Sequence, residues 1–270
     1  MKLQFTNGYR PHFDQISRIL NFILSRKDQS RVSRKEIVKN LGIPNKQVEN
    51  LTSMMTGFGL ILPRVTTLTP FGEKVITMDP YFEKLDTLWM IHYIVSSNPK
   101  WVVWHRIINI AFPAQDQFEV DQVSNDYFDD IAIHYSEKTI SEKLPKEVGA
   151  VFSAYTRSEL SYLRLMVVEE TGKFLKANPV DISDQSFLFS IIRYRDEYSP
   201  GSSAINVRDI CYGDNSPGRV LNLPEFQVRS LLENLHNANF IRLEKMANLD
   251  QVRISDQLTR NKVLESVYGK

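Results

Sequence analysis

Carboxylates and one histidine gather between residues 120 and 135. The group consists of Asp121, Asp126, Asp129, Asp130 and His134. Asp126, Asp130 and His134 are four residues apart in turn, so one continuous helix would place them along a single stripe. Carboxylate oxygens with one imidazole suit magnesium or manganese, and a metal held in this way can activate a nucleophile. These three residues are therefore the candidate catalytic groups, with Asp126 and Asp130 as candidate metal ligands. The alternative is a solvated acidic helix face, which charge runs usually form.

Other polar side chains offer weaker candidates. His105 and Asn109 are one helical turn apart, but Trp101 and Trp104 beside them favour a buried polar pair. His92 lies in an apolar helix and is expected to be a hydrogen-bonded core histidine. The sequence has no glycine-rich phosphate loop, no Ser-His-Asp order and no restriction-type array of two acids and a lysine.

Cys211 is the single cysteine of the chain. It excludes an internal disulfide framework and a cysteine-based zinc or iron–sulfur site. A persulfide on this thiol is one interpretation. An inert cysteine beside a turn is the other, and it is the more common case.

Residues 33–69 have the pattern of a helix-turn-helix followed by a two-stranded wing. Ser33 and Glu36 form a capping box, and Gly42 supplies the left-handed residue that ends the first helix. Pro44 stands where the second helix begins. That helix has an apolar face, made by Val48, Leu51, Met55 and Phe58. We expect its opposite face to be exposed and to carry Lys46, Gln47, Asn50 and Ser53.

A second module of the same kind is predicted near the C-terminus. Residues 186–195 and 224–237 are expected to be helices, and residues 240–243 and 251–254 to be wing strands. Side chains that can reach phosphates and base edges define the predicted DNA contacts in both modules. They are Arg34, Lys35, Lys46, Gln47, Asn50 and Arg64 in the first, and Gln227, Arg229, Arg242, Lys245 and Arg253 in the second. The alternative for each residue is simple solvation, and for the fold a winged helix used only for protein contacts.

Between the modules, apolar patterns predict helices over residues 71–78, 81–96 and 100–112, and a capped helix over 136–148. The predicted fold is therefore mainly α, with tandem winged helix-turn-helix modules joined by a helical middle region. The predicted domains are 1–78, 79–179 and 180–270.

Composition sets the remaining bounds. The 270 residues carry a net charge of +1, so any DNA contact must come from local clusters of cations. No segment approaches the roughly 20 apolar residues of a membrane span, and the first residues lack the apolar run of a signal peptide. We expect a cytoplasmic protein that does not contact a membrane.

Residues 68–112 resemble the domain-of-unknown-function family 4007. Three short motifs carry the resemblance. They are T-x-x-G at 69–72, directly after the predicted wing, DPYFE at 79–83, and TLW at 87–89 followed by His92. The family usually opens with a phenylalanine–serine–glycine–histidine–glutamate signature. Phe5 and Gly8 match parts of it, whereas the histidine–glutamate pair is absent or displaced.

The resemblance implies a role in bacterial DNA phosphorothioation and antiviral defence, like that of the B components of Ssp systems. It implies double-stranded DNA as ligand, and a cysteine desulfurase, an ATPase and an adenylyl-sulfate-reductase-like protein as partners. We therefore expect a DNA-binding component that presents DNA to sulfur-transfer enzymes. The alternatives are a metal-dependent nickase, which would use magnesium or manganese, and a helical scaffold for partner enzymes. No cofactor other than that metal is expected.

Overall fold

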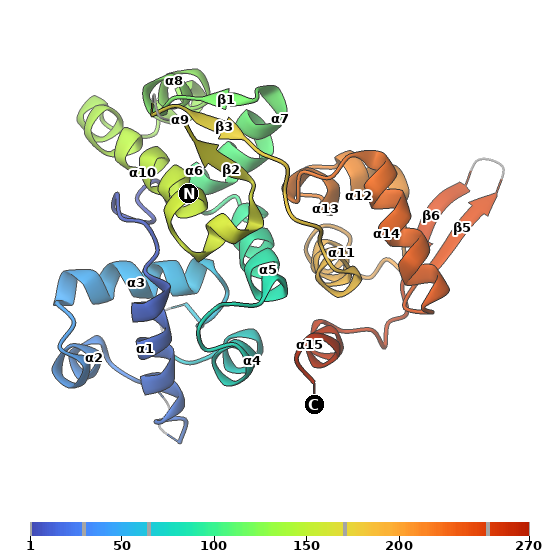
Figure 1. Cartoon of the computed structure of the whole chain (residues 1–270), viewed down its shortest axis with the longest axis horizontal. Helices are drawn as coiled ribbons and strands as arrows, with labels where there is room; N and C mark the ends of the chain where they lie inside the picture. The colour runs from blue at the N-terminus through green and yellow to red at the C-terminus, as the bar shows by residue number, and fades with distance from the viewer. Residues whose placement is uncertain (1, 29–30, 64–65, 170–171, 247–248, 270) are drawn as a thin grey trace. The chain divides into compact units, whose positions relative to one another are not determined.

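The computed structural model describes residues 2–28, 31–63, 66–169, 172–246 and 249–269. The protein is mainly helical, as the sequence predicts. It divides into two compact units, Met1–Val180 and Asp181–Lys270. Each unit is described by itself (Figure 1).

The first unit begins with a largely extended N-terminal segment, residues 2–12, and continues through helices and one small sheet. In chain order its elements are α1 (Phe13–Leu24), α2 (Arg34–Leu41), α3 (Asn45–Gly57), α4 (Pro70–Met78), α5 (Leu85–Ser96), α6 (Val102–Arg106), the π-helical turn η1 (Ile107–Ala111), α7 (Phe112–Ala114), β1 (Gln117–Phe118), α8 (Val120–Asp126), α9 (Asp129–Ala132), α10 (Glu137–Arg157), the 3-10 turn η2 (Glu159–Leu163), β2 (Met166–Val168) and β3 (Phe174–Lys176).

The start and end signals of α2 are those expected from the sequence. Ser33 and Glu36 form the predicted capping box, and Gly42 ends the helix with φ +67°. Pro44 is the residue before α3 rather than its first helical residue. Where the predicted wing is described, it holds one isolated antiparallel bridge, between Ile61 and Leu68. Arg64 lies outside the described residues.

Large aromatic side chains fill the core of the first unit. Phe5 of the N-terminal segment packs against Trp101, with ring centroids 4.5 Å apart, and against Phe58 at the end of α3. Trp104 contacts both Phe5 and Phe58. The N-terminal segment is therefore part of the core, and burial of Phe5 fixes where the residues around it lie.

Two predicted helices have different bounds in the structure. The helix expected over 81–96 begins only at Leu85. Before it, the Asp79 carboxylate accepts hydrogen bonds from the backbone N–H groups of Glu83 and Lys84. Phe82 adopts φ +56°, which is not a helical conformation. The helix expected over 136–148 continues to residue 157 as α10, because its apolar stripe persists beyond Gly149.

The second unit combines helices with a three-stranded antiparallel sheet. Its elements are α11 (Asp184–Tyr198), β4 (Ala204–Asn206), α12 (Val207–Tyr212), α13 (Pro217–Val220), α14 (Glu225–Asn237), β5 (Arg242–Met246), β6 (Leu249–Arg253) and α15 (Arg260–Tyr268). The strand order is β4-β6-β5, and buried Val252 of β6 pairs with Ile205 of β4 and Leu243 of β5. The smaller sheet of the first unit is also antiparallel, in the order β1-β3-β2.

Candidate nucleic-acid interface

Helices α2 and α3 present exposed cations on the surface of the first unit. Arg34 and Lys35 occupy the first two positions of α2, and Lys46 the second position of α3; all three are exposed. Lys46 forms a long ion pair with Glu49, 3.6 Å between nitrogen and oxygen. Gln47 is half-buried. These side chains can make backbone and base-edge contacts to a duplex.

Asn50 does not belong to this exposed face, contrary to the prediction. Its side chain is only 5% exposed, and its Oδ1 accepts a hydrogen bond of 2.5 Å from Nδ2 of Asn7. The helical period was correct, but the N-terminal segment covers α3 at this position. A buried, hydrogen-bonded amide cannot reach a base edge without first losing this partner.

The N-terminal segment is held by one buried carboxylate. Oε2 of Glu147, on α10, accepts from the backbone N–H of Phe5 and from both the N–H and the hydroxyl of Thr6. Its Oε1 accepts from the N–H of Gly8. Burial raises the pKa of Glu147, and the bonds from Thr6, Phe5 and Gly8 oppose that rise by favouring the charged form.

A hollow of about 650 Å³ lies beside α3. Its lining includes Lys2 and Asn7 of the N-terminal segment, Arg34 of α2, and Lys46, Glu49 and Ser53 of α3. A smaller hollow, of about 340 Å³, involves other residues of the same segment and helix, among them Arg10 and Gln47. Sequence reasoning did not identify Lys2, Asn7 or Ser53 as neighbours, because no periodic signal connects residues 2–8 to α3.

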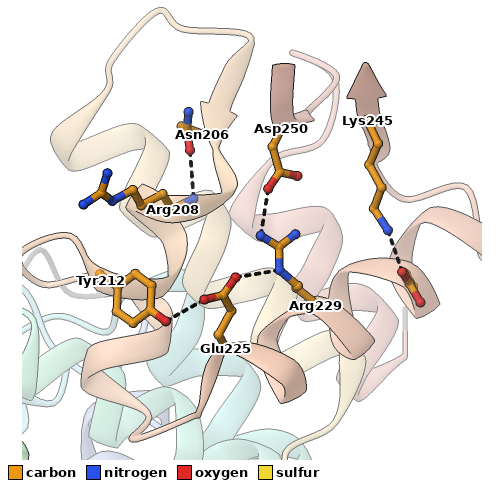
Figure 2. A network of polar contacts seen from close by, with 8 residues as sticks. Asn206, Arg208, Tyr212, Glu225, Arg229, Lys245 and Asp250 are labelled. Atoms are coloured by element: carbon orange, nitrogen blue, oxygen red, sulfur yellow. Dashed lines mark hydrogen bonds and ion pairs between the residues drawn. The ribbon is translucent and has the colours of Figure 1, made fainter. Parts of the chain in front are cut away.

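The predicted cations of the second unit are engaged in ion pairs. Figure 2 shows Arg229 of α14 between two carboxylates, with Nε 2.7 Å from Oε1 of Glu225 and Nη2 2.8 Å from Oδ2 of Asp250. Tyr212 donates to the other oxygen of Glu225, at 2.6 Å. The hydrogen bonds that Arg229 donates to Asp250 and Glu225 raise its pKa. Its charge is compensated within the protein.

The sheet cations are paired as well. Glu244 forms ion pairs with Arg253, at 3.0 Å, and with Arg242, at 3.6 Å. The hydrogen bond donated by Arg253 is the largest of the causes that lower the pKa of Glu244 to about 2. Lys245 pairs with Glu233 at 2.6 Å. Gln227 is exposed. Arg208, which the prediction omitted, is also exposed at the start of α12, and Figure 2 shows its guanidinium pointing away from the network.

The acidic group at residues 120–135 does not lie on one helix. α8 ends at Asp126, Tyr127 and Phe128 leave the helical conformation as Phe128 enters the core, and a short α9 then begins. Asp130 forms a bidentate ion pair with Arg106, at 2.6 and 3.2 Å, and Asp126 accepts from Gln122. In the part of the chain that the structure describes, no three His, Cys, Asp or Glu side chains are placed to share a metal ion. The prediction of one continuous helix is therefore wrong, and the assignment of Asp126, Asp130 and His134 to catalysis or metal binding stays a prediction.

The remaining polar candidates are structural. His92 is fully buried, with Nδ1 2.5 Å from the Tyr155 hydroxyl, as predicted for a core histidine. Asn109 is buried and donates to the carbonyls of Ser96 and His105. Cys211 is buried, and burial is the main cause that raises its pKa to about 11. The protonated thiol that this favours is a poor nucleophile.

The three tryptophans of the chain are buried. Trp89, Trp101 and Trp104 are at most 4% exposed, so they belong to the core of the first unit. None of the helices in the described ranges has the length and apolar character needed to cross a bilayer.

Comparison with known proteins supports one fold along the whole chain. Two crystal structures of SspB match it, one of them magnesium-bound. The magnesium-bound structure has a TM-score of 0.79 at 14% identity, and the other 0.80 at 15%; each match covers 98% of this chain and 87% of the other. At such low identity the likeness shows a shared fold alone. None of the curated proteins matches the sequence. The family model described as a protein of unknown function, DUF4007, matches residues 16–268, and the chain is therefore a member of the DUF4007 family.

Proposed function

We propose that this protein is a DNA-binding component of a bacterial phosphorothioation system. The observation that carries the proposal is the likeness of nearly the whole chain to the SspB fold, together with family membership. In this proposal the protein works in the cytoplasm, in antiviral defence. It presents double-stranded DNA to a cysteine desulfurase, an ATPase and an adenylyl-sulfate-reductase-like enzyme.

Two winged helix-turn-helix modules would hold the DNA. In the first unit α1, α2 and α3 precede the Ile61–Leu68 bridge, and in the second α11, β4, α12, the short α13 and α14 precede the paired strands β5 and β6. This order matches that of winged helices, in which α3 and α14 would be the recognition helices. We assign the principal DNA contact to the first unit, because Arg34 and Lys35 there are exposed, whereas Arg229, Arg242, Lys245 and Arg253 are paired with carboxylates.

Fluorescence anisotropy with a labelled duplex tests the proposal. Lys46→Ala/Gln47→Ala should weaken binding about tenfold, because it removes a charged contact and a polar contact from α3. Lys262→Ala is the matched control, since Lys262 is exposed on α15 and should leave the affinity unchanged. A wild-type chain that does not bind duplex DNA would refute the proposal.

Metal-dependent DNA nicking is the second candidate, because one of the SspB structures is magnesium-bound. The assignment of Asp126, Asp130 and His134 to catalysis stays a prediction, and their present arrangement supplies no shared metal site. Incubation of supercoiled plasmid with pure protein and magnesium or manganese tests the activity. Nicking that survives Asp126→Ala/Asp130→Ala would remove these residues from the candidate list.

A further inference from the structure

Three cations from separate segments line the hollow beside α3. Lys2 comes from the N-terminal segment, Arg34 from α2 and Lys46 from α3. The segment brings Lys2 there because Phe5 is buried in the aromatic core and Glu147 binds the backbone at Phe5, Thr6 and Gly8. The position of Lys2 is thus set by two kinds of tertiary contact: the packing of the Phe5 side chain and the hydrogen bonds of Glu147 to the backbone.

The ammonium group of Lys2 has a defined place. Its Nζ donates to Oγ of Ser53 at 2.7 Å and lies 5.7 Å from the ring centroid of Trp101. The backbone N–H of Lys2 donates to the carbonyl of Lys100 at 2.9 Å. Because Ser53 Oγ accepts this bond, its own hydroxyl hydrogen stays available to a ligand, as do the remaining N–H groups of Lys2.

Cations outnumber carboxylates in the described lining of the hollow. Among the described residues of its lining, Glu49 is the only one with an acidic side chain, and it pairs with Lys46 at 3.6 Å. Neither Lys2 nor Arg34 belongs to an ion pair among the described residues. Burial lowers the pKa of Lys2, and the nearby charges of Glu147 and Glu49 oppose that change. Like charges gathered around a hollow repel one another, and an anion placed between them relieves that repulsion.

We propose that this hollow binds a phosphate of the DNA backbone, with Lys2 and Arg34 as its charged contacts and Ser53 as a hydrogen-bond donor. The inference rests on the proposed DNA-binding function and says where on the first unit a DNA phosphate would bind. A phosphate fits better than a base, because Trp101 is buried and offers no open face for stacking. The N-terminal segment then forms one wall of the site, and it covers Asn50 while adding Lys2.

The test compares the salt dependence of duplex binding by the full chain. Lys2→Gln/Arg34→Gln should lower affinity at least tenfold and reduce the slope of log K against log salt by about 1, the value of one released counterion. Lys262→Gln/Arg157→Gln is the control of equal charge, because both residues are exposed and lie outside the lining of the hollow. This control variant should change the affinity and the salt slope only by the small effect of the lower net charge.

Two further variants keep the result interpretable. Arg34→Gln alone leaves the N-terminal segment untouched, so its loss of affinity cannot arise from a loosened segment. Ser53→Ala should weaken binding severalfold without changing the salt slope. If wild type binds DNA and Lys2→Gln/Arg34→Gln binds with the same affinity and slope, the phosphate site is refuted while the proposed function stands. If wild type does not bind DNA, both are refuted.

Discussion

The carboxylate of Glu147 and the N-terminal residue Thr6 are joined by two hydrogen bonds of 2.9 Å, from the backbone N–H and from the hydroxyl of Thr6 to the same oxygen. The two residues are 141 positions apart in sequence, and both are buried. The bonds tie the start of the chain to α10, and through that contact they bring Lys2 and Asn7 to the polar side of α3.

Replacement of Glu147 by Ala should destabilise the protein by about 2–6 kcal/mol. The change leaves the buried N–H groups of Phe5 and Thr6 without an acceptor, and such groups cost about 1–3 kcal/mol each. Urea unfolding measures the free energy. Faster cleavage before α1 in limited proteolysis would show that the segment is released, and a chain as stable as wild type would contradict the argument.

The pH dependence of stability should carry the signature of Glu147. Burial raises the pKa of Glu147 above the ordinary value of 4.5, so the folded protein holds this proton more tightly than the unfolded chain. As the pH rises from 4.5 to the raised pKa, the folded state binds more protons than the unfolded state, and the free energy of unfolding falls. Glu147→Gln should remove this fall. An unchanged pH profile of urea midpoints would show that another group causes it.

Asn50→Ala should lower stability, by about 1 kcal/mol, because it leaves the Asn7 amide without its acceptor. It should have little effect on DNA affinity measured at a temperature where the variant is folded. Lys46→Ala should do the reverse, since Lys46 is exposed and only weakly paired. Thermal unfolding and anisotropy on the same two samples separate the cases. A selective loss of DNA binding by Asn50→Ala would mean that the N-terminal segment moves away from α3.

Arg229→Ala should destabilise the second unit by about 1–2 kcal/mol, because it leaves Glu225 and Asp250 without their shared cation. Arg208→Ala is the matched control from the same surface, since that guanidinium has no ion pair among the described residues. Thermal unfolding of the full chain compares them. Equal stability of the two variants would show that the network in Figure 2 contributes nothing measurable.

The Cys211 thiol should react slowly with iodoacetamide at neutral pH. A rise of its pKa from 9.0 to about 11 lowers the thiolate fraction about a hundredfold, and burial limits access further. The rate, followed by mass spectrometry, should increase steeply with pH and in denaturant. Rapid alkylation at pH 7 would instead favour the persulfide interpretation.

Local rules predicted much of the first module. The capping box of α2 and the left-handed Gly42 depend on residues within a few positions of one another, so the sequence contains the whole signal. The same rules failed at residues 120–135. There a constant spacing of four suggested one helix, but the burial of Phe128 ended α8 and separated Asp126 from Asp130.

The sequence by itself determined a mainly helical chain, the apolar faces of its helices and the cations at the start of α2 and α3, because these follow from periodicity and capping. Only the tertiary structure decided which polar groups are free to bind. It buried Asn50 beneath Asn7, paired Arg229 with Glu225 and Asp250, and placed Lys2 beside Ser53. Asn7 and Asn50 are 43 positions apart, Arg229 and Asp250 are 21 apart, and Lys2 and Ser53 are 51 apart. No local pattern encodes contacts over such separations.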